Sequence, residues 1–356
     1  MSATEIARVD RNFDRIVVRP PNWIGDALLA LPALAAVRRH FPVAALTIAA
    51  PVPVAALFRE ETDVRPDAVI DLPKAPRAQV AAIAAIRADL CVLFPNSFRS
   101  AWTVRRAGVP ERWGYARAMR GWLLTKTAAR EKRSGVEHHA DYYRALVRGL
   151  GMRCEDDAPR MQVTAASRAQ AARLLAEGGV PADARVIALA PGAAYGLAKQ
   201  WPPERVAALI ARFATELSAS CVMVGADHDR AAARAIESWL SANTRDAAAR
   251  VVNLTGRTSV NALAGVLASS AALVTNDSGA MHLAAALGRP VVAIFGPTDE
   301  RATRPLGTHA LVTAEVFCRP CLLRDCPIDH RCMTRITVDT VFDATSQQLA
   351  RAEAEA

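Results

Sequence analysis

Short apolar runs alternate with amphipathic, alanine-rich stretches along this chain, and each kind of stretch predicts a different element. In the first half, runs rich in valine, isoleucine and leucine predict strands at residues 15–18, 45–49, 68–72 and 90–94. Apolar positions at helical spacing predict helices at residues 27–40 and 138–150. Continuous apolar strands separated by helices are typical of a parallel sheet in an α/β protein.

A second strand–helix series begins near residue 185. Strands are predicted at residues 186–190, 221–224, 251–254, 271–275 and 290–295, and helices at 203–217, 230–240, 260–268 and 280–287. The polar stretch at residues 154–162 has the composition of an interdomain linker. A chain of 356 residues is long enough for two domains. We therefore predict domains at residues 1–165 and 166–335, followed by a helix at 336–356 that packs back on the first domain.

Residues 275–299 carry the densest set of candidate binding groups. The sequence Asn276-Asp277-Ser278-Gly279 follows a predicted strand and opens a predicted helix. Such a turn presents backbone N–H groups and a positive helix end at the carboxyl edge of a parallel sheet. Open α/β sheets bind anionic ligands at this edge. The turn is equally compatible with a structural helix cap.

The loop after the first predicted strand ends in Asp26, at the first turn of a helix. A carboxylate in this place is either a helix cap or a general base directed into the crevice. The loop contains neither the GxGxxG of a dinucleotide-binding fold nor the GKS/T of a P-loop, which argues against both.

Two loops of the second half have related chemistry. Residues 191–202 contain glycine and end in Lys199, which could neutralise a phosphate group or could be an ordinary surface lysine. Asp229 lies at a helix start, where a carboxylate could accept hydrogen bonds from ribose hydroxyls or cap the helix.

Composition excludes some classes of protein. The sequence is 52% hydrophobic but has no uninterrupted apolar run near the ~18 residues of a membrane span. The first 15 residues are too charged for a signal peptide. We expect a soluble cytoplasmic protein with reduced cysteines.

Basic residues are concentrated in the first half. Residues 1–175 contain 27 Lys and Arg against 17 Asp and Glu, whereas residues 176–356 contain 17 against 18. Between residues 99 and 133 there are ten basic and two acidic residues, interleaved with Trp102, Trp113, Tyr115 and Trp122. Such a stretch is either a solvated face or a surface for nucleic acid, an acidic membrane or a phosphorylated glycolipid.

A cysteine cluster lies near the C-terminus, at Cys318, Cys321, Cys326 and Cys332, with His330 between the last two. Zinc or an iron–sulfur centre is conceivable here. Only one Cys-x-x-Cys pair is present, and the other spacings are not those of a standard zinc ribbon. We therefore predict free thiols in an ordered loop and no metal.

Five motifs occur in an order that resembles a known family. They are NWIGD at residues 22–26, PNSFR at 95–99, the loop at 191–202, NDSGAMH at 276–282 and GPTD at 296–299. Together they resemble the lipopolysaccharide heptosyltransferases, which are inverting glycosyltransferases of family nine, over residues 15–345. The Asn-Ser-Phe-Arg element and the cysteine-rich segment favour the type II enzymes over type I; types I and III remain alternatives.

The resemblance implies a GT-B fold of two facing Rossmann-like domains with a central cleft. It implies transfer of L-glycero-D-manno-heptose from ADP-heptose, bound by the C-terminal domain, to the first heptose of Kdo2-lipid A, bound by the N-terminal domain. It further implies no metal cofactor, no nucleic-acid partner and peripheral association with the anionic cytoplasmic face of the inner membrane.

The resemblance also assigns roles to residues. Asp26 matches the catalytic base and Lys199 the lysine that faces the donor diphosphate. Further donor-binding positions are Gly225, Asp229, Leu254, Asn276, Asp277, Ser278, Gly279, His282 and Thr298. Acceptor-binding positions are Asn22, Trp23, Asn96, Ser97, Arg99 and Arg120.

Two other functions were weighed. A GT-B-like nucleotide-sugar epimerase would need no acceptor and would leave the one-sided basic stretch unexplained. A non-enzymatic nucleic-acid-binding protein is suggested by the sequence pI near 9.6 and the Trp/Arg stretch, and would bind with a steep salt dependence.

Overall fold

The computed structural model describes residues 13–129 and 135–355. The chain divides into two compact units, Met1–Pro159 and Arg160–Ala356. The division falls within the polar stretch predicted as the linker and six residues before the predicted boundary. Residues 160–165 thus belong to the second unit rather than to the first.

The first unit is built on a six-stranded parallel sheet with the strand order β4-β2-β1-β5-β6-β7. The strands are β1 (Arg15–Arg19), β2 (Ala45–Ala50), β4 (Ala68–Asp71), β5 (Leu90–Leu93), β6 (Glu111–Tyr115) and β7 (Lys126–Ala128). The short strand β3 (Glu61–Thr62) lies outside this sheet. The central strands β1 and β5 are almost wholly buried, as their apolar sequences require.

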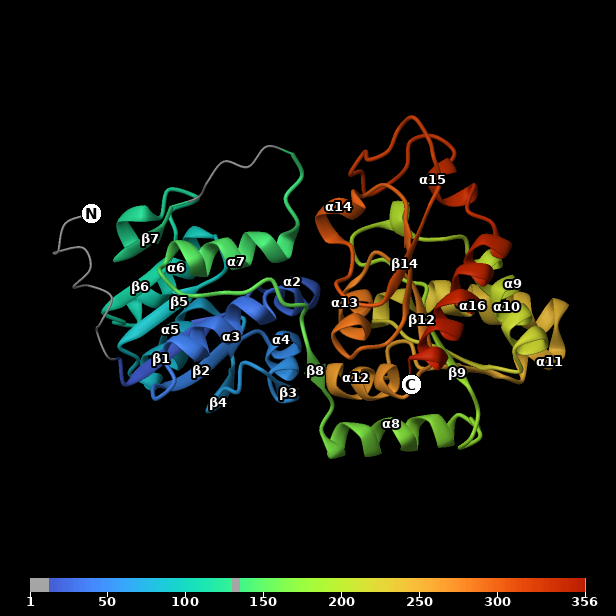
Figure 1. Ribbon diagram of the computed structural model, residues 1–356, viewed down its shortest axis with the longest axis horizontal. Coiled ribbons are helices and arrows are strands. Elements are labelled where there is room, and N and C mark those ends of the chain that lie inside the picture. The colour runs from blue at the N-terminus through green and yellow to red at the C-terminus, as the bar shows by residue number, and fades with distance from the viewer. Residues whose placement is uncertain (1–12, 130–134, 356) are drawn as a thin grey trace. The chain divides into compact units, whose positions relative to one another are not determined.

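Helices cover both faces of the first sheet (Figure 1). Helices α5 (Pro76–Ile86) and α6 (Phe98–Arg106) pack against each other on one face. The other face carries α2 (Ile24–Leu29), α3 (Leu31–His40), α4 (Val52–Leu57) and α7 (His139–Gly149).

The second unit repeats this topology. Its parallel sheet has the order β11-β10-β9-β12-β13-β14. The strands are β9 (Val186–Ala190), β10 (Ser220–Met223), β11 (Val251–Asn253), β12 (Ala272–Asn276), β13 (Val291–Phe295) and β14 (His309–Thr313), with β8 (Met161–Gln162) outside the sheet. If the six strands of each sheet are numbered along the chain, both sheets have the order 3-2-1-4-5-6 of a Rossmann fold.

The helices of the second unit also form two layers (Figure 1). Helices α9 (Pro203–Glu216), α10 (Arg230–Asn243), α11 (Arg245–Ala248) and α16 (Val338–Ala354) pack together on one side. On the other side α8 (Ala165–Glu177) packs on α12 (Val260–Ala268), which contacts α13 (Gly279–Ala286). The short helices α14 (Glu300–Thr303) and α15 (Arg331–Thr334) follow β13 and precede α16 respectively.

The strand order determines where the candidate functional residues lie in each sheet. The order of strands reverses between β1 and β5 in the first sheet and between β9 and β12 in the second. Loops leave the carboxyl ends of these neighbouring strands in opposite directions, which opens a crevice at each reversal point. The loops carrying Asp26, Lys199 and Asp277 all start at one of these two crevices.

Three expectations from the sequence differ from the structure. The helix predicted at residues 27–40 is broken into α2 and α3, because Pro32 cannot donate to the carbonyl of the preceding turn. The stretch 109–120, where no strand was predicted, contains the strand β6. The C-terminal helix α16, predicted as an element that follows the second domain, belongs to the second unit and places Val341, Phe342 and Leu349 in its core.

In the part of the chain that the structure describes, no helix is both long and apolar enough to cross a membrane.

Candidate active site

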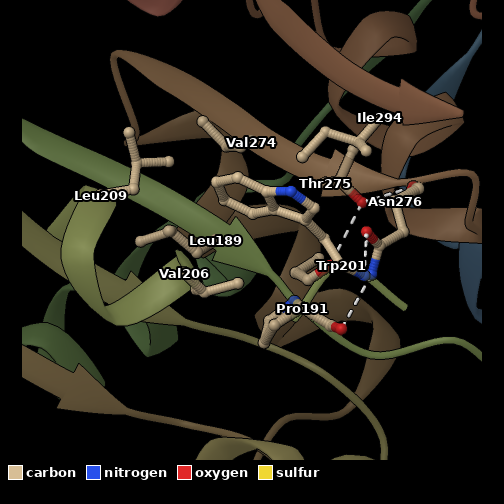
Figure 2. Close-up of a pocket in the computed structure, with 10 residues that line it drawn as sticks. Leu189, Pro191, Trp201, Val206, Leu209, Val274, Thr275, Asn276 and Ile294 are labelled. Atoms are coloured by element: carbon tan, nitrogen blue, oxygen red, sulfur yellow. Dashed lines mark hydrogen bonds between the residues drawn. The ribbon is translucent and has the colours of Figure 1, made fainter. Parts of the chain in front are cut away.

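The crevice of the second unit is held together by the side-chain amide of Asn276, the last residue of β12. Its Nδ2 donates to the carbonyl oxygens of Pro191, at 2.8 Å, and Gly192, at 3.1 Å. Its Oδ1 accepts a 3.2 Å hydrogen bond from the backbone N–H of Trp201. Figure 2 shows the amide between these two segments of the loop after β9. Asn276 is only 2% exposed. Asn276, a predicted donor-binding residue, therefore shapes the loop after β9.

Beneath this loop lies a small apolar cavity around the indole of Trp201. Leu189, Val206, Leu209 and Ile294 line it (Figure 2). Its volume of about 10 Å³ is too small for a nucleotide sugar. The cavity belongs to the packing that anchors Trp201, whose indole N–H donates to the carbonyl of Ile336 at 3.2 Å.

Lys199 forms a buried ion pair with Asp277. The loop after β9 ends in a 3₁₀ turn, η2 (Leu197–Lys199), which places the lysine Nζ 2.5 Å from Asp277 Oδ2. Thr298 donates to the same carboxylate oxygen at 2.8 Å. Lys199 also lies over the ring of Tyr195, 4.8 Å from its centroid. The mobile lysine that the sequence suggested is thus a buried cation held in place.

The helix α13 begins directly beside this pair. Ser278 is its N-cap residue, and the Ser278 hydroxyl lies 2.9 Å from that of Thr275. Gly279 is the first helical residue, and His282, one turn later, is buried. The exposed N–H groups of the first turn carry partial positive charge. Lys199 and this helix end are thus two sources of positive potential in the crevice.

Asp229 lies on the other side of the loop after β9. It ends the 3₁₀ turn η3 (Asp227–Asp229), and its Oδ2 accepts a 2.9 Å hydrogen bond from the N–H of Ala226. A Cβ on Gly192 would fall 2.1 Å from Asp229 Oδ1, and one on Gly225 would fall 2.9 Å from Oδ2. Only glycine permits this approach. Leu254, a further predicted donor residue, is 1% exposed and can offer only backbone groups.

The cysteine-rich segment braces the Lys199 turn. Ala198, the residue before the lysine, donates to the carbonyl of Arg324 at 2.9 Å. The ring of His330 lies 2.7 Å from the carbonyl of Ala198. The Tyr195 hydroxyl donates to the carbonyl of Leu322 at 2.9 Å.

The four cysteines of this segment line one cavity of about 50 Å³, together with His330. Among the described residues, no three His, Cys, Asp or Glu side chains are placed as a metal-binding group. Burial, and then the neighbouring thiols, raise the pKa of Cys332 to about 11, so this thiol is protonated near neutral pH.

In the first unit, Asp26 is the third residue of α2 and faces α7. Its Oδ1 lies 3.2 Å from Nδ1 of His139, the first residue of α7. Burial, followed by the charge of Asp26 and a hydrogen bond with it, raises the pKa of the Tyr143 phenol. The sequence analysis found neither His139 nor Tyr143, because only the contact between α2 and α7 brings them to Asp26.

The predicted acceptor residues follow β1 and β5. Asn22 and Trp23 lie at the start of α2, and Trp23 is 73% exposed. Ser97 caps α6 by accepting from the N–H of Ser100 at 3.2 Å, and Arg99 is exposed in the first turn. Asn96 donates to the hydroxyl of Tyr142 at 2.6 Å.

Arg120, predicted to bind the acceptor, lies in the interior of the first unit. It is completely buried and donates to the carbonyl oxygens of Tyr115 and Pro95 and to the hydroxyl of Ser100. Burial lowers its pKa to about 10, so the guanidinium remains charged near pH 7. Arg120 ties the ends of β5 and β6 together, and a count of basic residues could not show this.

A family model now decides the class of the protein. The model described as glycosyltransferase family 9 (heptosyltransferase) matches residues 77–331. The chain belongs to glycosyltransferase family 9.

Relatives of this glycosyltransferase span most of its length. Lipopolysaccharide heptosyltransferase 2 of Escherichia coli K12 is 29% identical over 313 residues, covering 84% of this chain and 87% of that protein. Lipooligosaccharide heptosyltransferase 2 of Haemophilus ducreyi is 26% identical over 358 residues, covering 94% and 99%.

Solved structures confirm the GT-B fold predicted from the sequence. The structure of E. coli ADP-heptose lipopolysaccharide heptosyltransferase II is 26% identical and superposes with a TM-score of 0.81, covering 95% of this chain and 99% of that one. An E. coli heptosyltransferase bound to ADP-2-deoxy-2-fluoro heptose has the same fold, with a TM-score of 0.67 at 21% identity. These comparisons do not favour an epimerase or a nucleic-acid-binding protein.

The Lys199–Asp277 pair of this glycosyltransferase allows a double-mutant test. We expect Lys199→Met and Asp277→Asn each to lower the free energy of unfolding by about 3 kcal/mol or more, because each leaves a buried group without its partner. The double variant should lose clearly less than the sum, since no unpaired charge remains. Denaturant unfolding of the four proteins measures the coupling.

The exposed pair Arg59–Asp71, with an N–O distance of 2.9 Å, is the matched control. Its coupling should stay below about 1 kcal/mol because solvent screens it. Additive losses at Lys199 and Asp277 would show that the two charges do not stabilise each other.

Proposed function

We propose that this glycosyltransferase moves L-glycero-D-manno-heptose from ADP-heptose to the first heptose of Kdo2-lipid A, in lipopolysaccharide inner-core synthesis. The observation that carries the proposal is the match to E. coli ADP-heptose lipopolysaccharide heptosyltransferase II over 95% of this chain and 99% of that one. The cationic crevice at Lys199 supports it, because a diphosphate leaving group needs positive partners.

Asp26 is the proposed general base. In an inverting transfer the acceptor oxygen attacks the anomeric carbon while the bond to ADP breaks, and the base takes the hydroxyl proton. A single carboxylate is sufficient, unlike the pair that a glycoside hydrolase needs. The contact with His139 at 3.2 Å supports this role, because it fixes the direction of one carboxylate oxygen.

Lys199 is the proposed partner of the leaving ADP. Its ammonium group has three N–H bonds, of which the 2.5 Å contact with Asp277 uses one. The others, with the N–H groups at the start of α13, can stabilise the growing charge on the diphosphate. Asp229 and the backbone at Gly225 and Leu254 are the proposed contacts of the adenosine. We propose that this reaction needs no metal ion.

The first unit presents an exposed aromatic and basic surface, formed by α6 and the 3₁₀ turn η1 (Gly121–Leu123). The rings of Phe98, Trp102 and Trp122 lie 6.1–6.4 Å apart and are 42%, 41% and 61% exposed. The Arg105 guanidinium lies 5.1 Å from the Trp122 ring centroid. Three further basic residues close by in the sequence are exposed: Arg99, Arg106 and Arg117. The remaining basic residues of this stretch, Arg130, Lys132 and Arg133, lie outside the described residues.

We propose that this aromatic–basic surface binds the anionic cytoplasmic face of the inner membrane. Tryptophan is enriched where protein meets lipid headgroups, and each arginine near an anionic bilayer contributes about 1 kcal/mol. Peripheral binding of this kind would bring the enzyme to an acceptor that is itself a lipid.

The proposed reaction predicts which acceptor is used. Incubation with ADP-heptose should add one heptose to an acceptor that ends in heptose, and little to one that ends in Kdo. Mass spectrometry of the products measures both, and the reaction should proceed equally in EDTA. Preferential use of the Kdo-terminated acceptor would indicate a type I enzyme instead.

The general base gives a second prediction. Asp26→Asn should lower turnover by about 10²–10⁴-fold, because the amide keeps the shape but cannot accept the proton. ADP-heptose affinity and unfolding temperature should stay near wild type. The exposed Asp63→Asn is the control and should retain full activity. A variant that loses stability but keeps its turnover per folded molecule would show that Asp26 is only a helix cap.

The aromatic–basic surface gives a third prediction. The double variant Arg105→Gln, Arg106→Gln should bind vesicles rich in anionic lipid at least tenfold more weakly, since about 2 kcal/mol of attraction is lost. Vesicle sedimentation at two salt concentrations measures this. Arg168→Gln with Arg173→Gln, both exposed on α8, changes the net charge equally and should leave binding unchanged. Equal losses from both pairs would indicate attraction by net charge alone.

A further inference from the structure

Arg19 occupies the centre of the crevice region of the first sheet. It is the last residue of β1 and pairs with Leu93 of β5, so it lies where the strand order reverses. By strand alternation its side chain is on the same face as Val17, which packs with Cys91 and Val104 beneath α5 and α6. Only 4% of Arg19 is exposed.

The Arg19 guanidinium lacks the partners that a buried charge requires. Its Nε and Nη1 are buried, and neither has a hydrogen-bond partner. Within residues 13–129 and 135–355 no ion pair to Arg19 is found. By contrast Arg144, which is 5% exposed, pairs with Asp141 at 2.7 Å and also donates to the carbonyl of Asp157.

Among the residues that the structure describes, none that interacts with Arg19 supplies a negative charge. The group that interacts electrostatically with it is Cys91, and burial raises the pKa of this thiol to about 12. The thiol is therefore neutral near pH 7. Cys91 also interacts electrostatically with Arg120 and Arg112, and burial of the thiol outweighs all three arginines in setting its pKa. Burial lowers the pKa of Arg19, but a guanidinium stays protonated at neutral pH.

A buried and unpaired cation destabilises a fold unless an anion completes the site. Arginine matches the two oxygens of a phosphate or carboxylate with parallel N–H bonds. The loop after β5 leads into the nine-residue helix α6, whose N-terminus at the same sheet edge adds positive potential.

We propose that Arg19 binds an oxyanion, a phosphate or carboxylate group, at the reversal point of the first sheet. Building on the proposed function, this group belongs to the acceptor rather than to the donor diphosphate. The assignment to the acceptor follows from the position of Arg19 in the first unit, whereas Lys199 and the start of α13 supply the cationic groups of the second.

The test compares wild type with Arg19→Met and Arg19→Lys, using inorganic phosphate as the probe. Phosphate at millimolar concentration should raise the unfolding temperature of the wild-type protein, and Arg19→Met should weaken phosphate binding at least tenfold. Without phosphate, Arg19→Met should unfold at the wild-type temperature or above, since the unpaired buried charge is gone. Arg19→Lys should keep the charge but bind phosphate more weakly than wild type.

Two controls make the result specific. Arg144→Met removes an arginine that already has partners, so it should lower the basal unfolding temperature and leave the phosphate response intact. ADP should bind Arg19→Met and wild type equally if the site serves the acceptor; a loss of ADP affinity would overturn that assignment.

An unchanged phosphate response in Arg19→Met, or in Arg19→Lys if the methionine variant does not fold, would overturn the proposal. So would a wild-type protein that phosphate does not stabilise. These readouts require no heptose transfer. A failed transfer assay with an intact Arg19-dependent response would therefore count against the proposed function only. In transfer assays, Arg19→Met should raise the acceptor KM at least tenfold and leave the donor KM unchanged.

Discussion

The hydrogen bonds of Asn276 are the constraint on which the second crevice depends. Strands β9 and β12 are neighbours, and the loops that follow them leave in opposite directions. A single amide joins these loops by donating to Pro191 and Gly192 and accepting from Trp201. Because Asn276, Pro191 and Trp201 are buried, losing the amide would leave buried backbone groups unsatisfied. Asn276 thereby fixes both ends of the segment that carries the Lys199 turn, which lies between Gly192 and Trp201.

Much of the architecture could be predicted, because parallel strands buried on both faces leave continuous apolar runs in the sequence. The runs that became β1, β5, β9 and β12 were all found in this way. The strand β6 was missed because its sequence, ERWGY, is as polar and aromatic as a loop. Its place in the sheet depends on pairing with β5, which local sequence does not record.

The positions of the candidate residues could be predicted from the sequence, but the contacts between these residues could not. The turn at Asp277 and the loop at Lys199 each have a local signature. Their 2.5 Å ion pair joins residues 78 positions apart, and the contact of Asp26 with His139 joins residues 113 apart. The count of basic residues showed which unit is rich in arginine, but it did not show which individual arginines are buried. Arg120 and Arg19 are both buried. Arg120 donates hydrogen bonds to backbone carbonyls, whereas a thiol and apolar side chains lie beside Arg19.

The bracing of the Lys199 turn by the cysteine-rich segment has a consequence for biosynthesis. The carbonyl of Arg324 and the ring of His330 hold Ala198, and the carbonyl of Ile336 accepts from the Trp201 indole. These partners lie more than 120 residues further along the chain. During translation the first unit can fold as soon as it emerges, because domains fold as units from the N-terminus. The lysine turn acquires its bracing only when the last part of the chain has left the ribosome. A chain released before its C-terminal segment is made would have a folded first unit, but its second unit could not hold Lys199 in position.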